Sequence, residues 1–440
     1  MSQTRGIGVG VIGFGTIGTG VVRVLREHAS HIRKRLGFPI RLVRVADLDI
    51  RTDRGVRLPK GVLIRDAKRL IRDPDVDVVV ELIGGQEPAR TFLLEAIKAG
   101  KSVVSANKAL LSTQGPALAA AAERAGVALG FEASVGGGIP IVRTLRDAVA
   151  GDRNAEVYGI VNGTANYILS RMASGGEAFD DVLADAQALG LAEADPSYDV
   201  DGTDSLHKLV LLVALAFGKK INPELVHVEG IHNISSVDIA YAREFGYTLR
   251  LLAVAKDTRD GVEAHVHPSM VPNSHLLSQV SGSFNAICLK GKALGDSLYY
   301  GQGAGMMPTA TAVVADVIEA ARAIVENSAA DVLPYGQPVS NLSSARVVPM
   351  GRISHQHYIR FKLADKPGVL AKISKILARE GIGIATVSQH ERPSRGMVPV
   401  VMRTHRAREA SLKKALTAIG RLKDSRARPV VIRVEEGLGE

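Results

Sequence analysis

The feature that most constrains the fold of this chain is a glycine-rich turn close to its N-terminus. The turn reads Gly13-Phe14-Gly15-Thr16-Ile17-Gly18. Residues 6–12 before it are apolar and predict a strand, and residues 17–36 after it carry apolar side chains at helical spacing. In this order the glycines allow a tight turn and a close approach of the backbone to a pyrophosphate, which the helix N-terminus attracts. We therefore predict a dinucleotide-binding turn; a turn that only packs the helix on the strand is the alternative.

The first 130 residues alternate between short strands and helices. Apolar segments rich in Val and Ile predict strands at residues 6–12, 40–46, 77–83, 101–105 and 127–131. Helical spacing predicts helices at residues 17–36, 89–99 and 116–125, followed by the candidate C-caps Gly37, Gly100 and Gly126. This alternation predicts a doubly wound parallel sheet of the Rossmann type.

The pattern changes after about residue 140 and again near residue 335. Strands predicted at residues 157–161, 247–255 and 263–267, with helices at 164–172 and 202–217, indicate a second α/β domain. A further helix is predicted at residues 309–325. Pro334, Pro338 and the Ser/Asn-rich residues 340–344 then indicate a linker. A strand at residues 357–363 starts a third domain.

The composition excludes several classes of function. Lys and Arg exceed Asp and Glu by 55 to 45, but the arginines are spread along the chain and aromatic residues make up only 4%, so we expect no nucleic-acid partner. A basic surface suited to small anionic ligands is the simpler interpretation. The apolar run at residues 209–217 is shorter than the roughly 18–20 residues that cross a bilayer, so no membrane span is expected. The single Cys288 excludes an internal disulfide and favours a reducing, cytoplasmic location.

The residues expected to determine the preference for NAD or NADP lie at the end of the second predicted strand. Asp47 lies there and can accept a hydrogen bond from a ribose 2′-hydroxyl, which favours NAD. Arg44, Arg51 and Arg54 are close in sequence and offer partners for a 2′-phosphate, which favours NADP. The residues alone leave both open.

An acidic segment, residues 193–208, leads into the apolar helix. It departs from a calcium-binding EF-hand loop at Thr203 and Val210, so we reject that interpretation. Asp204 and Lys208 are four residues apart and share one face of the helix. A lysine beside a buried helix can have its pKa lowered enough to exchange protons near neutral pH. An ordinary ion pair between the two side chains is the alternative.

From residue 186 to residue 208 the chain resembles the signature of the homoserine dehydrogenases over 23 consecutive residues. The matching positions are Ala186, Gly190-Leu-Ala, Asp195-Pro, Asp199-Val, Gly202, Asp204 and Lys208. Three other stretches agree, starting at Ser105-Ala-Asn107-Lys108, Glu132-Ala-Ser-Val135 and Tyr300-Gly-Gln-Gly303. The resemblance covers roughly residues 7–330 and implies an N-terminal Rossmann-type domain followed by a second α/β domain for substrate binding and dimerisation.

The resemblance implies hydride transfer between a nicotinamide and the carbon that interconverts L-aspartate 4-semialdehyde and L-homoserine, on the route to threonine, methionine and isoleucine. Lys208 matches the family's proton donor and acceptor, and Asp204 matches the carboxylate that holds and tunes the site. Glu193 matches the acid that binds the substrate's amino group. Lys108 matches a second active-site lysine near nicotinamide and substrate, and the roles of the two lysines stay unranked.

The resemblance also implies a structural sodium ion. Backbone carbonyls of Val135, Gly137 and Ile139, with Glu132, would bind it, and oxygen-only ligands suit a hard cation. A plain tight turn is the alternative. Gly303 matches a backbone contact to the cofactor. Because Ala46 stands where many members have a basic residue before the strand-end acid, we expect NADP with NAD tolerated.

Residues 357–384 resemble the opening of an ACT domain, a βαββαβ module. In physical terms a strand is followed by a turn, in which Pro367 presets φ and Gly368 relieves crowding, and by an amphipathic helix that ends at Gly381. The resemblance implies a sensor of L-threonine. The effector loop would comprise Asp365, Pro367, Gly368, Val369 and Leu370. An oligomerisation module without a ligand is the alternative.

These expectations set the domain bounds. They are a nucleotide-binding domain at residues 1–133, completed by a returning helix at about 306–335, a catalytic domain at 134–305, a linker at 336–352 and the ACT domain at 353–440. The chain starts just before its first strand, so we expect a monofunctional enzyme without a kinase segment, as a homodimer or homotetramer.

Three alternatives to this enzyme were weighed. A phosphorylating semialdehyde dehydrogenase needs a cysteine nucleophile, and the lone Cys288 has no basic partner near it in sequence. A hydroxy-acid dehydrogenase would have a His/carboxylate/Arg set where this chain has Asp204 and Lys208. A sensor that has lost catalysis is the third, and the intact acidic and basic residues argue against it.

Overall fold

A computed structural model of the chain describes residues 6–389, 397–425 and 427–438. It divides into two compact units, which are described separately. Unit 1 comprises Met1–Val157, His207–Pro223 and Asn285–Ala345, and unit 2 comprises Tyr158–Leu206, Glu224–Phe284 and Arg346–Glu440. Among the described residues, no helix has both the length and the apolar character needed to cross a membrane.

Unit 1 contains a six-stranded sheet in which every neighbouring pair is parallel. Its strands are β1 (Ile7–Ile12), β2 (Ile40–Ala46), β3 (Leu63–Ile64), β4 (Val78–Glu81), β5 (Ser102–Ser105) and β6 (Leu129–Gly130). Their order is β3-β2-β1-β4-β5-β6, so the order of the strands reverses beside β1. All residues of β1, β4 and β5 are buried, as expected of strands covered by helices on both faces. The predicted doubly wound sheet is confirmed.

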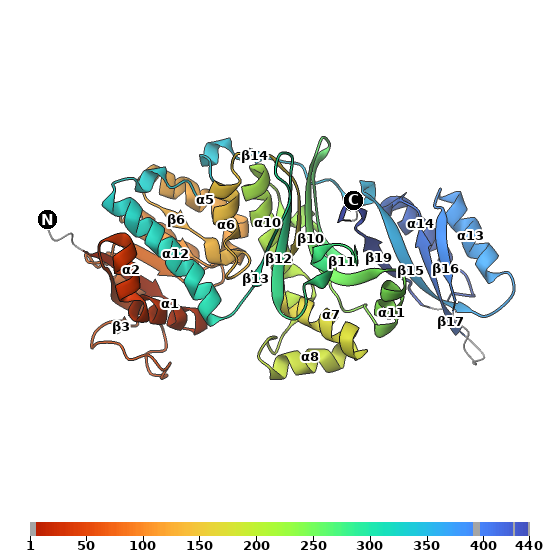
Figure 1. Ribbon diagram of the computed structural model, residues 1–440, viewed down its shortest axis with the longest axis horizontal. Coiled ribbons are helices and arrows are strands. Elements are labelled where there is room, and N and C mark those ends of the chain that lie inside the picture. Colours follow the sequence, from red (N-terminus) through yellow and green to blue (C-terminus); the bar gives the residue numbers. More distant parts are fainter. Residues whose placement is uncertain (1–5, 390–396, 426, 439–440) are drawn as a thin grey trace. The chain divides into compact units, whose positions relative to one another are not determined.

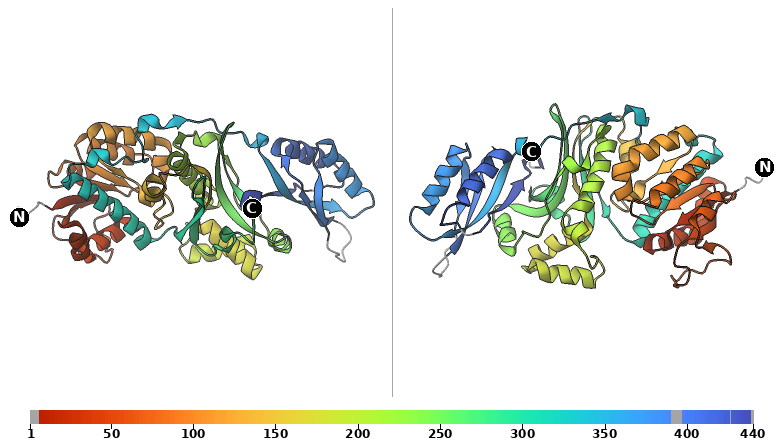
Figure 2. Two further views of the ribbon diagram at one scale, coloured as in Figure 1. Left: turned by 45° about the horizontal axis from the view of Figure 1, so that its top comes forward. Right: turned by 180° about the vertical axis from the view of Figure 1, so that it is seen from behind.

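Helices cover both faces of this sheet. They are α1 (Thr16–Glu27), α2 (Ala29–Leu36), α3 (Ala67–Arg72), α4 (Ala89–Lys98), α5 (Lys108–Ala125) and α12 (Met306–Val325). The views from front and back show α1 and α12 on one face and α4 and α5 on the other (Figures 1 and 2). Val21 of α1 and Val313 of α12 join Val9, Val11 and Val80 of the strands in one apolar core. The helix predicted at residues 309–325 thus belongs to the same core as the first strand.

Two of the predicted helices have wrong bounds. The helix expected at residues 17–36 is interrupted at His28, which has φ −98° and ψ 11° and separates α1 from α2. The helix expected from residue 116 already starts at Lys108, because the side-chain oxygen of Asn107 caps it by accepting the N–H of Leu110. Pro116 lies inside this helix. The predicted C-caps Gly37 and Gly126 have left-handed backbone conformations.

The remainder of unit 1 includes further strands. They are β12 (Phe284–Gly291) and β13 (Gly295–Gln302), which neighbour β7 (Asn154–Ile160) in the order β13-β12-β7, and the parallel pair β8 (Lys219–Lys220) and β14 (Ser343–Ser344). Short α6 (Ile141–Arg143) follows the turn after β6. Helix α10 (Thr203–Phe217) has residues 203–206 in unit 2 and residues 207–217 in unit 1.

Unit 2 starts with an α-helical segment and a long hairpin. The elements are α7 (Gly163–Gly175), α8 (Phe179–Ala188), α9 (Ser197–Val200), β9 (His227–Val228), α11 (Ser236–Glu244), β10 (Tyr247–Thr258) and β11 (Gly261–Pro272). Strands β10 and β11 pair antiparallel along their whole length, from Tyr247 opposite Pro272 to Thr258 opposite Gly261. Both strands are longer than predicted.

The C-terminal part of unit 2 has the predicted order βαββαβ. Its elements are β15 (Ser354–Ala364), α13 (Val369–Arg379), β16 (Ile384–Ser388), β17 (Met397–Thr404), β18 (Ala407–Arg408), α14 (Glu409–Ile419) and β19 (Val430–Val434). The sheet order is β19-β15-β17-β16, and the helices bury Ile373, Leu377 and Leu412 against Phe361 and Val400. Strand β19 also pairs with β11 in parallel, so the sheet of this module continues into the hairpin.

Candidate active site

The glycine-rich turn lies at the carboxyl end of β1, where the strand order reverses. Gly13 has φ +101°, and a Cβ atom there would lie 2.8 Å from the carbonyl oxygen of Leu82. A Cβ atom on Gly18 would lie 2.0 Å from the carbonyl oxygen of Gly13. Only glycine fits both positions, and the turn runs directly into the N-terminus of α1. This is the crevice in which doubly wound sheets bind dinucleotides.

Asp47 and Arg54 lie together beside this turn. The backbone N–H of Phe14 donates to Asp47 Oδ2 at 2.5 Å, and Arg54 Nη2 is 3.6 Å from Asp47 Oδ1. The Arg54 guanidinium also lies over the Phe14 ring, 5.1 Å from its centroid. Arg44 instead contacts Asp73 at 3.1 Å. Of the three candidate arginines, Arg54 is thus the one that contacts the strand-end carboxylate.

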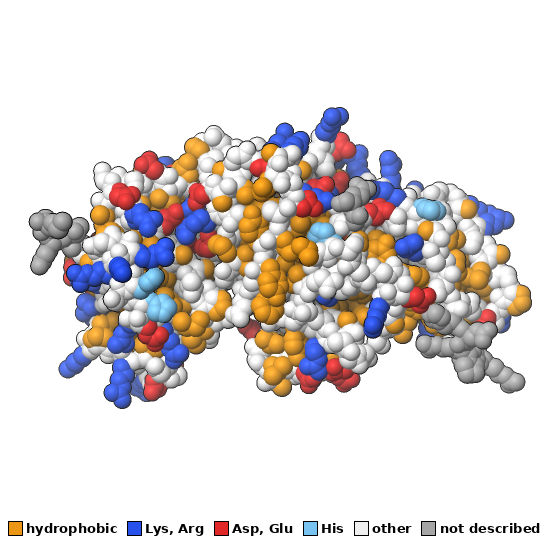
Figure 3. Space-filling model, viewed as in Figure 1, with side chains coloured by type: hydrophobic (Ala, Val, Ile, Leu, Met, Phe, Trp, Pro, Cys, Tyr) orange, Lys and Arg blue, Asp and Glu red, His pale blue; other side chains and the backbone are white. Residues whose placement is uncertain are grey.

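An open pocket of about 270 Å³ lies beside Phe14 of the glycine-rich turn. Its polar lining includes Thr52, Asp53, Arg54 and Lys60, with Phe14 as an apolar wall. Figure 3 shows many Lys and Arg side chains over α1, α2 and the loop after β2. Both features suit an anionic ligand.

A buried hydrogen-bond network fixes the start of α5, where Lys108 lies. The Glu81 carboxylate accepts the N–H of Ile83 at 2.8 Å and the Ser105 hydroxyl at 2.6 Å. The Ser105 hydroxyl in turn accepts the N–H of Asn107 at 3.1 Å. Asn107 caps α5, so the network determines where Lys108, the first residue of this helix, lies. Glu81 was not a predicted site residue, although a carboxylate that ends an all-valine strand is a usable signal.

Asp204 and Lys208 are both buried on α10, with 2% and 7% of their surface exposed. Asp204 Oδ2 accepts a hydrogen bond from Asn162 Nδ2 at 2.8 Å, and the same nitrogen donates to Asp199 Oδ1 at 2.8 Å. Asn162 Oδ1 accepts the N–H of Ala165 and so caps α7. Two buried charged side chains cost desolvation free energy that an exposed ion pair does not. Asn162 was not a predicted site residue, because its contact joins segments distant in sequence.

Glu193 lies in the segment between α8 and α9 in unit 2 and is exposed. Its carbonyl oxygen accepts a hydrogen bond from Gln187 Nε2 at 3.0 Å, which anchors this segment to α8.

The predicted sodium-binding turn has a buried carboxylate at its start. Glu132 Oε1 and Oε2 accept the N–H groups of Val142 and Arg143, each at 2.9 Å. Burial raises the pKa of Glu132. The neighbouring Asp316 accepts the N–H of Glu132 at 2.7 Å, and burial together with the charge of Glu132 raises the pKa of Asp316 to about 8.

The Gly303 turn packs directly on the sodium-binding turn. Gly137 has φ +58°, and a Cβ atom on it would lie 2.4 Å from the carbonyl oxygen of Gly303. The N–H of Gly138 donates to the carbonyl oxygen of Gln302 at 3.0 Å. The structure therefore places Gly137 of the predicted sodium-binding turn directly against Gly303.

The predicted effector loop lies between β15 and α13. Asp365, Pro367 and Gly368 are exposed, Val369 is buried, and Leu370 is 39% exposed. Gly368 has φ +85°, which explains why glycine opens α13. A hydrogen bond anchors the end of β15 just before this turn: the N–H of Ala364 donates to the carbonyl oxygen of Asp424 at 2.9 Å.

Family models match most of the chain. The model described as "Homoserine dehydrogenase, NAD binding domain" matches residues 13–132, "Homoserine dehydrogenase" matches residues 140–318, and "ACT domain" matches residues 357–424. The second model contains the segment with Glu193, Asp204 and Lys208, and the first contains the glycine-rich turn and Lys108.

Curated relatives and solved structures agree with these matches. The homoserine dehydrogenase of Neisseria gonorrhoeae is 41% identical over 430 residues, covering 98% of each chain, and that of Bacillus subtilis is 37% identical, covering 94% of each. The crystal structure of a homoserine dehydrogenase from Thiobacillus denitrificans is similar with a TM-score of 0.91 at 41% identity, over 98% of this chain and 99% of that one. The chain therefore belongs to the homoserine dehydrogenase family and is an oxidoreductase with a nicotinamide-cofactor domain and an ACT domain.

Proposed function

We propose that this chain interconverts L-aspartate 4-semialdehyde and L-homoserine, with Lys208 as the group that moves the proton. The observation that carries the proposal is the burial of Lys208 and Asp204 on one helix, within the segment that the family model matches. A lysine out of water beside a carboxylate is placed to exchange a proton, because burial disfavours its charged form while the carboxylate favours it.

The bound nicotinamide would supply the hydride to the aldehyde carbon or accept it in the reverse direction. As the carbonyl oxygen gains negative charge, the Lys208 ammonium donates a proton to it and the alcohol forms. In oxidation, neutral Lys208 Nζ takes the hydroxyl proton. Asp204, held by Asn162, keeps Lys208 in place, Glu193 binds the substrate's amino group, and Lys108 contacts nicotinamide and substrate.

We propose NADP as the preferred cofactor, with NAD tolerated. Support comes from Arg54, which lies against Asp47 and lines the pocket next to the glycine-rich turn, where a 2′-phosphate would need a cation. Asp47 accepts the Phe14 N–H, so part of its capacity to bind a ribose hydroxyl is already used. A hyperthermophilic archaeal homoserine dehydrogenase with the same fold, at 24% identity and a TM-score of 0.61, was determined in complex with NADPH.

We further propose that the turn at Glu132, Val135, Gly137 and Ile139 binds a sodium ion with a structural role. The residues fit such an ion, since the available donors are all oxygens and the buried Glu132 carboxylate supplies negative charge. The close contact of Gly137 with Gly303 supports a role in shaping the cofactor contact at Gly303.

For regulation, we propose that the C-terminal module binds L-threonine at residues 365–370 and thereby inhibits the enzyme. The exposed turn and the partly exposed Leu370 beside it support this assignment.

We also propose the domain bounds 1–133 with 306–335, 134–305, 336–352 and 353–440. We further propose that the protein is a homodimer or homotetramer and that it is located in the cytoplasm.

The reaction is tested by following NADPH and NADH oxidation with L-aspartate 4-semialdehyde, with and without L-threonine. We expect Lys208→Ala to lower kcat about 10²- to 10⁴-fold while cofactor binding, measured by fluorescence titration, is retained. Lys413→Ala, an exposed lysine of α14, is the control and should leave kcat unchanged. Absence of turnover with either cofactor in the unmodified protein would refute the enzymatic assignment.

A further inference from the structure

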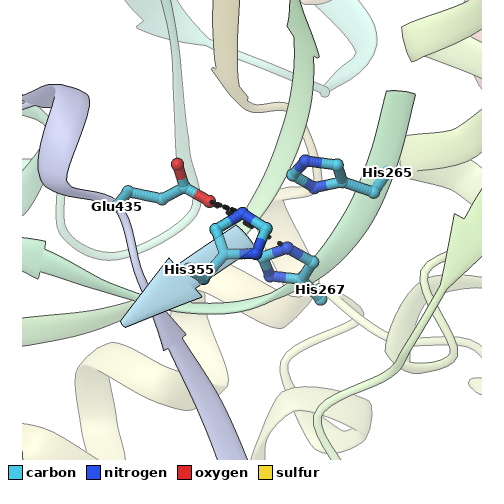
Figure 4. Close-up of side chains that lie close together, drawn as sticks. All are labelled: His265, His267, His355 and Glu435. Carbon is cyan, nitrogen blue, oxygen red and sulfur yellow. Dashed lines mark ion pairs between the residues drawn. The ribbon is translucent and has the colours of Figure 1, made fainter. Parts of the chain in front are cut away.

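Four buried polar side chains converge where the C-terminal module meets the β10–β11 hairpin in unit 2. They are His265 and His267 on β11, His355 on β15, and Glu435 directly after β19 (Figure 4). Each is at most 5% exposed. His265 and His267 are two residues apart on one strand, so both side chains point to the same face of the sheet. Neither the glycine-rich turn nor the Lys208 segment belongs to this group.

The four side chains have the geometry of a metal site. One ligand atom from each lies within 4.8 Å of the others. Glu435 Oε1 is 3.8 Å from His355 Nε2 and 4.0 Å from His267 Nε2. Ligand atoms of a tetrahedral zinc ion with bonds of about 2.0–2.1 Å lie about 3.3 Å apart, so small side-chain rotations suffice to bind one. The His265 ring is stacked on that of His267, with centroids 4.6 Å apart, and must turn about its Cβ–Cγ bond to present a nitrogen.

Several of the candidate ligand atoms have no hydrogen-bond partner within the part of the chain that the structure describes. This holds for both nitrogens of His265, for His267 Nε2 and for Glu435 Oε1. A buried polar atom without a partner costs about 1–3 kcal/mol, so several together at one point need an explanation. Imidazole nitrogens and a carboxylate oxygen that face each other without donors between them are suited to a shared cation.

The atoms that point away from this centre lie near other polar groups. His267 Nδ1 lies 2.9 Å from the Ser269 hydroxyl and 3.1 Å from the carbonyl oxygen of Pro268, and a proton on Nδ1 donated to that carbonyl would leave Nε2 free to bind a metal. His355 Nδ1 lies 3.4 Å from Glu409 Oε1, and Glu435 Oε2 lies 3.7 Å from Lys256 Nζ. Carboxylates and carbonyls on the far nitrogen are what orient histidines in metal sites.

Charged side chains of both signs lie near this centre. Arg433 pairs with Glu229 and Glu409, each at 2.7 Å, and Lys256 Nζ lies 3.7 Å from Glu435 Oε2. Burial, together with neighbouring positive charges, holds the pKa of both His265 and His267 well below the ordinary value.

We propose that His265, His267, His355 and Glu435 bind one divalent transition-metal ion of the zinc class, with a structural role. Three imidazoles and one carboxylate match the donor preference and coordination number of zinc. The ion would link β11, β15 and the segment after β19, and so connect the C-terminal module to the hairpin. This proposal is independent of the proposed reaction.

The test is the zinc content of the full chain produced in zinc-supplemented medium, measured by plasma mass spectrometry after gel filtration. We expect about one zinc per chain in the unmodified protein, and at least a tenfold lower content in His265→Gln and in Glu435→Gln. His405→Gln changes an exposed histidine of the same unit and should keep the zinc. Zinc content equal in all four proteins, or absent from the unmodified protein, would overturn the proposal.

A second measurement does not depend on whether the variants fold. The unmodified chain is produced with Co²⁺ in place of zinc, and its visible absorption spectrum is recorded. We expect the intense bands of four-coordinate Co²⁺ with nitrogen and oxygen ligands, together with a thermal unfolding midpoint above that of the chelator-treated protein. Weak bands typical of six-coordinate Co²⁺, or no bound cobalt, would count against the site.

Discussion

Asp316 lies fully buried on α12 beside a second buried carboxylate, Glu132. It accepts the Glu132 N–H at 2.7 Å, and its other oxygen is 3.3 Å from Arg143 Nη2. Burial and the charge of Glu132 raise its pKa from the ordinary 3.8 to about 8. Because the folded state binds the proton more tightly than the unfolded state, this group stabilises the fold at low pH, and its contribution is lost as the pH rises towards 8.

Asp316→Asn should therefore remove a pH dependence of stability. In the unmodified protein we expect the free energy of unfolding to fall between pH 5 and pH 8, by at most about 1.4 kcal/mol per pH unit from this group. The variant should show a flatter profile in urea titrations at several pH values. Asp331→Asn, in an exposed position of the same unit, should retain the slope of the unmodified protein. Parallel profiles for both variants would contradict the raised pKa.

The residues of the candidate site differ in how far sequence could identify them. The glycines of the turn, Asp204 and Lys208 can be identified from their spacing within a short stretch of sequence. Glu81 and Asn162 do not, because their roles come from contacts with Ser105 and Asp204, at separations of 24 and 42 residues. Such contacts exist only once the chain has folded.

At the scale of elements, the hydrogen bonds of Glu81 join the ends of β4 and β5 to α5. Ser105→Ala removes the hydroxyl that donates to Glu81 at 2.6 Å and accepts the N–H of Asn107 at 3.1 Å. A buried carboxylate and an N–H then both lose a partner, which costs about 1–3 kcal/mol. We expect a decrease of that size in the free energy of unfolding, measured in urea, and a raised KM for the cofactor because the start of α5 shifts.

The matched control is Ser340→Ala, in an exposed position outside the six-stranded sheet. It should change neither the stability nor the KM. A Ser105→Ala protein as stable as this control would show that the network does not fix the start of α5.

β1, β4 and β5 of the first sheet were predicted because they are buried on both faces and read as uninterrupted apolar runs, whereas the two-residue, half-buried β3 was missed. β13 was missed because Gly295–Gln302 is exposed or half-buried along its length and shows no apolar alternation. The strand ends where β10 and β11 meet were missed because they contain polar residues such as Asp257, which interrupt the apolar pattern. These residues belong to the strands only because the two strands pair along their whole length. The start of α5 depended on the Asn107 cap, whereas Pro116, typical of a first helical turn, suggested a later start.

At the scale of the whole molecule, Asp238 connects two parts of unit 2 that are far apart in sequence. Its carboxylate is fully buried at the start of α11 and accepts hydrogen bonds from the Tyr358 hydroxyl at 2.9 Å and from Arg360 Nε and Nη2 at 2.7 and 2.9 Å. It also accepts the N–H of Ser235, which caps α11. The first strand of the C-terminal module is thus bound to the preceding helix through one charge.

Asp238→Asn should weaken this connection without touching any residue proposed to act on the substrate. It leaves the Arg360 charge without its carboxylate in a half-buried position, and breaking a buried pair in this way costs about 3–5 kcal/mol. If the C-terminal module transmits threonine binding through this contact, the threonine concentration for half-inhibition should rise severalfold while kcat without threonine stays unchanged. Asp260→Asn, in the exposed turn of the hairpin, is the control. Unchanged inhibition together with a lowered unfolding midpoint would show that Asp238 serves stability alone, and that regulation reaches the catalytic residues by another route.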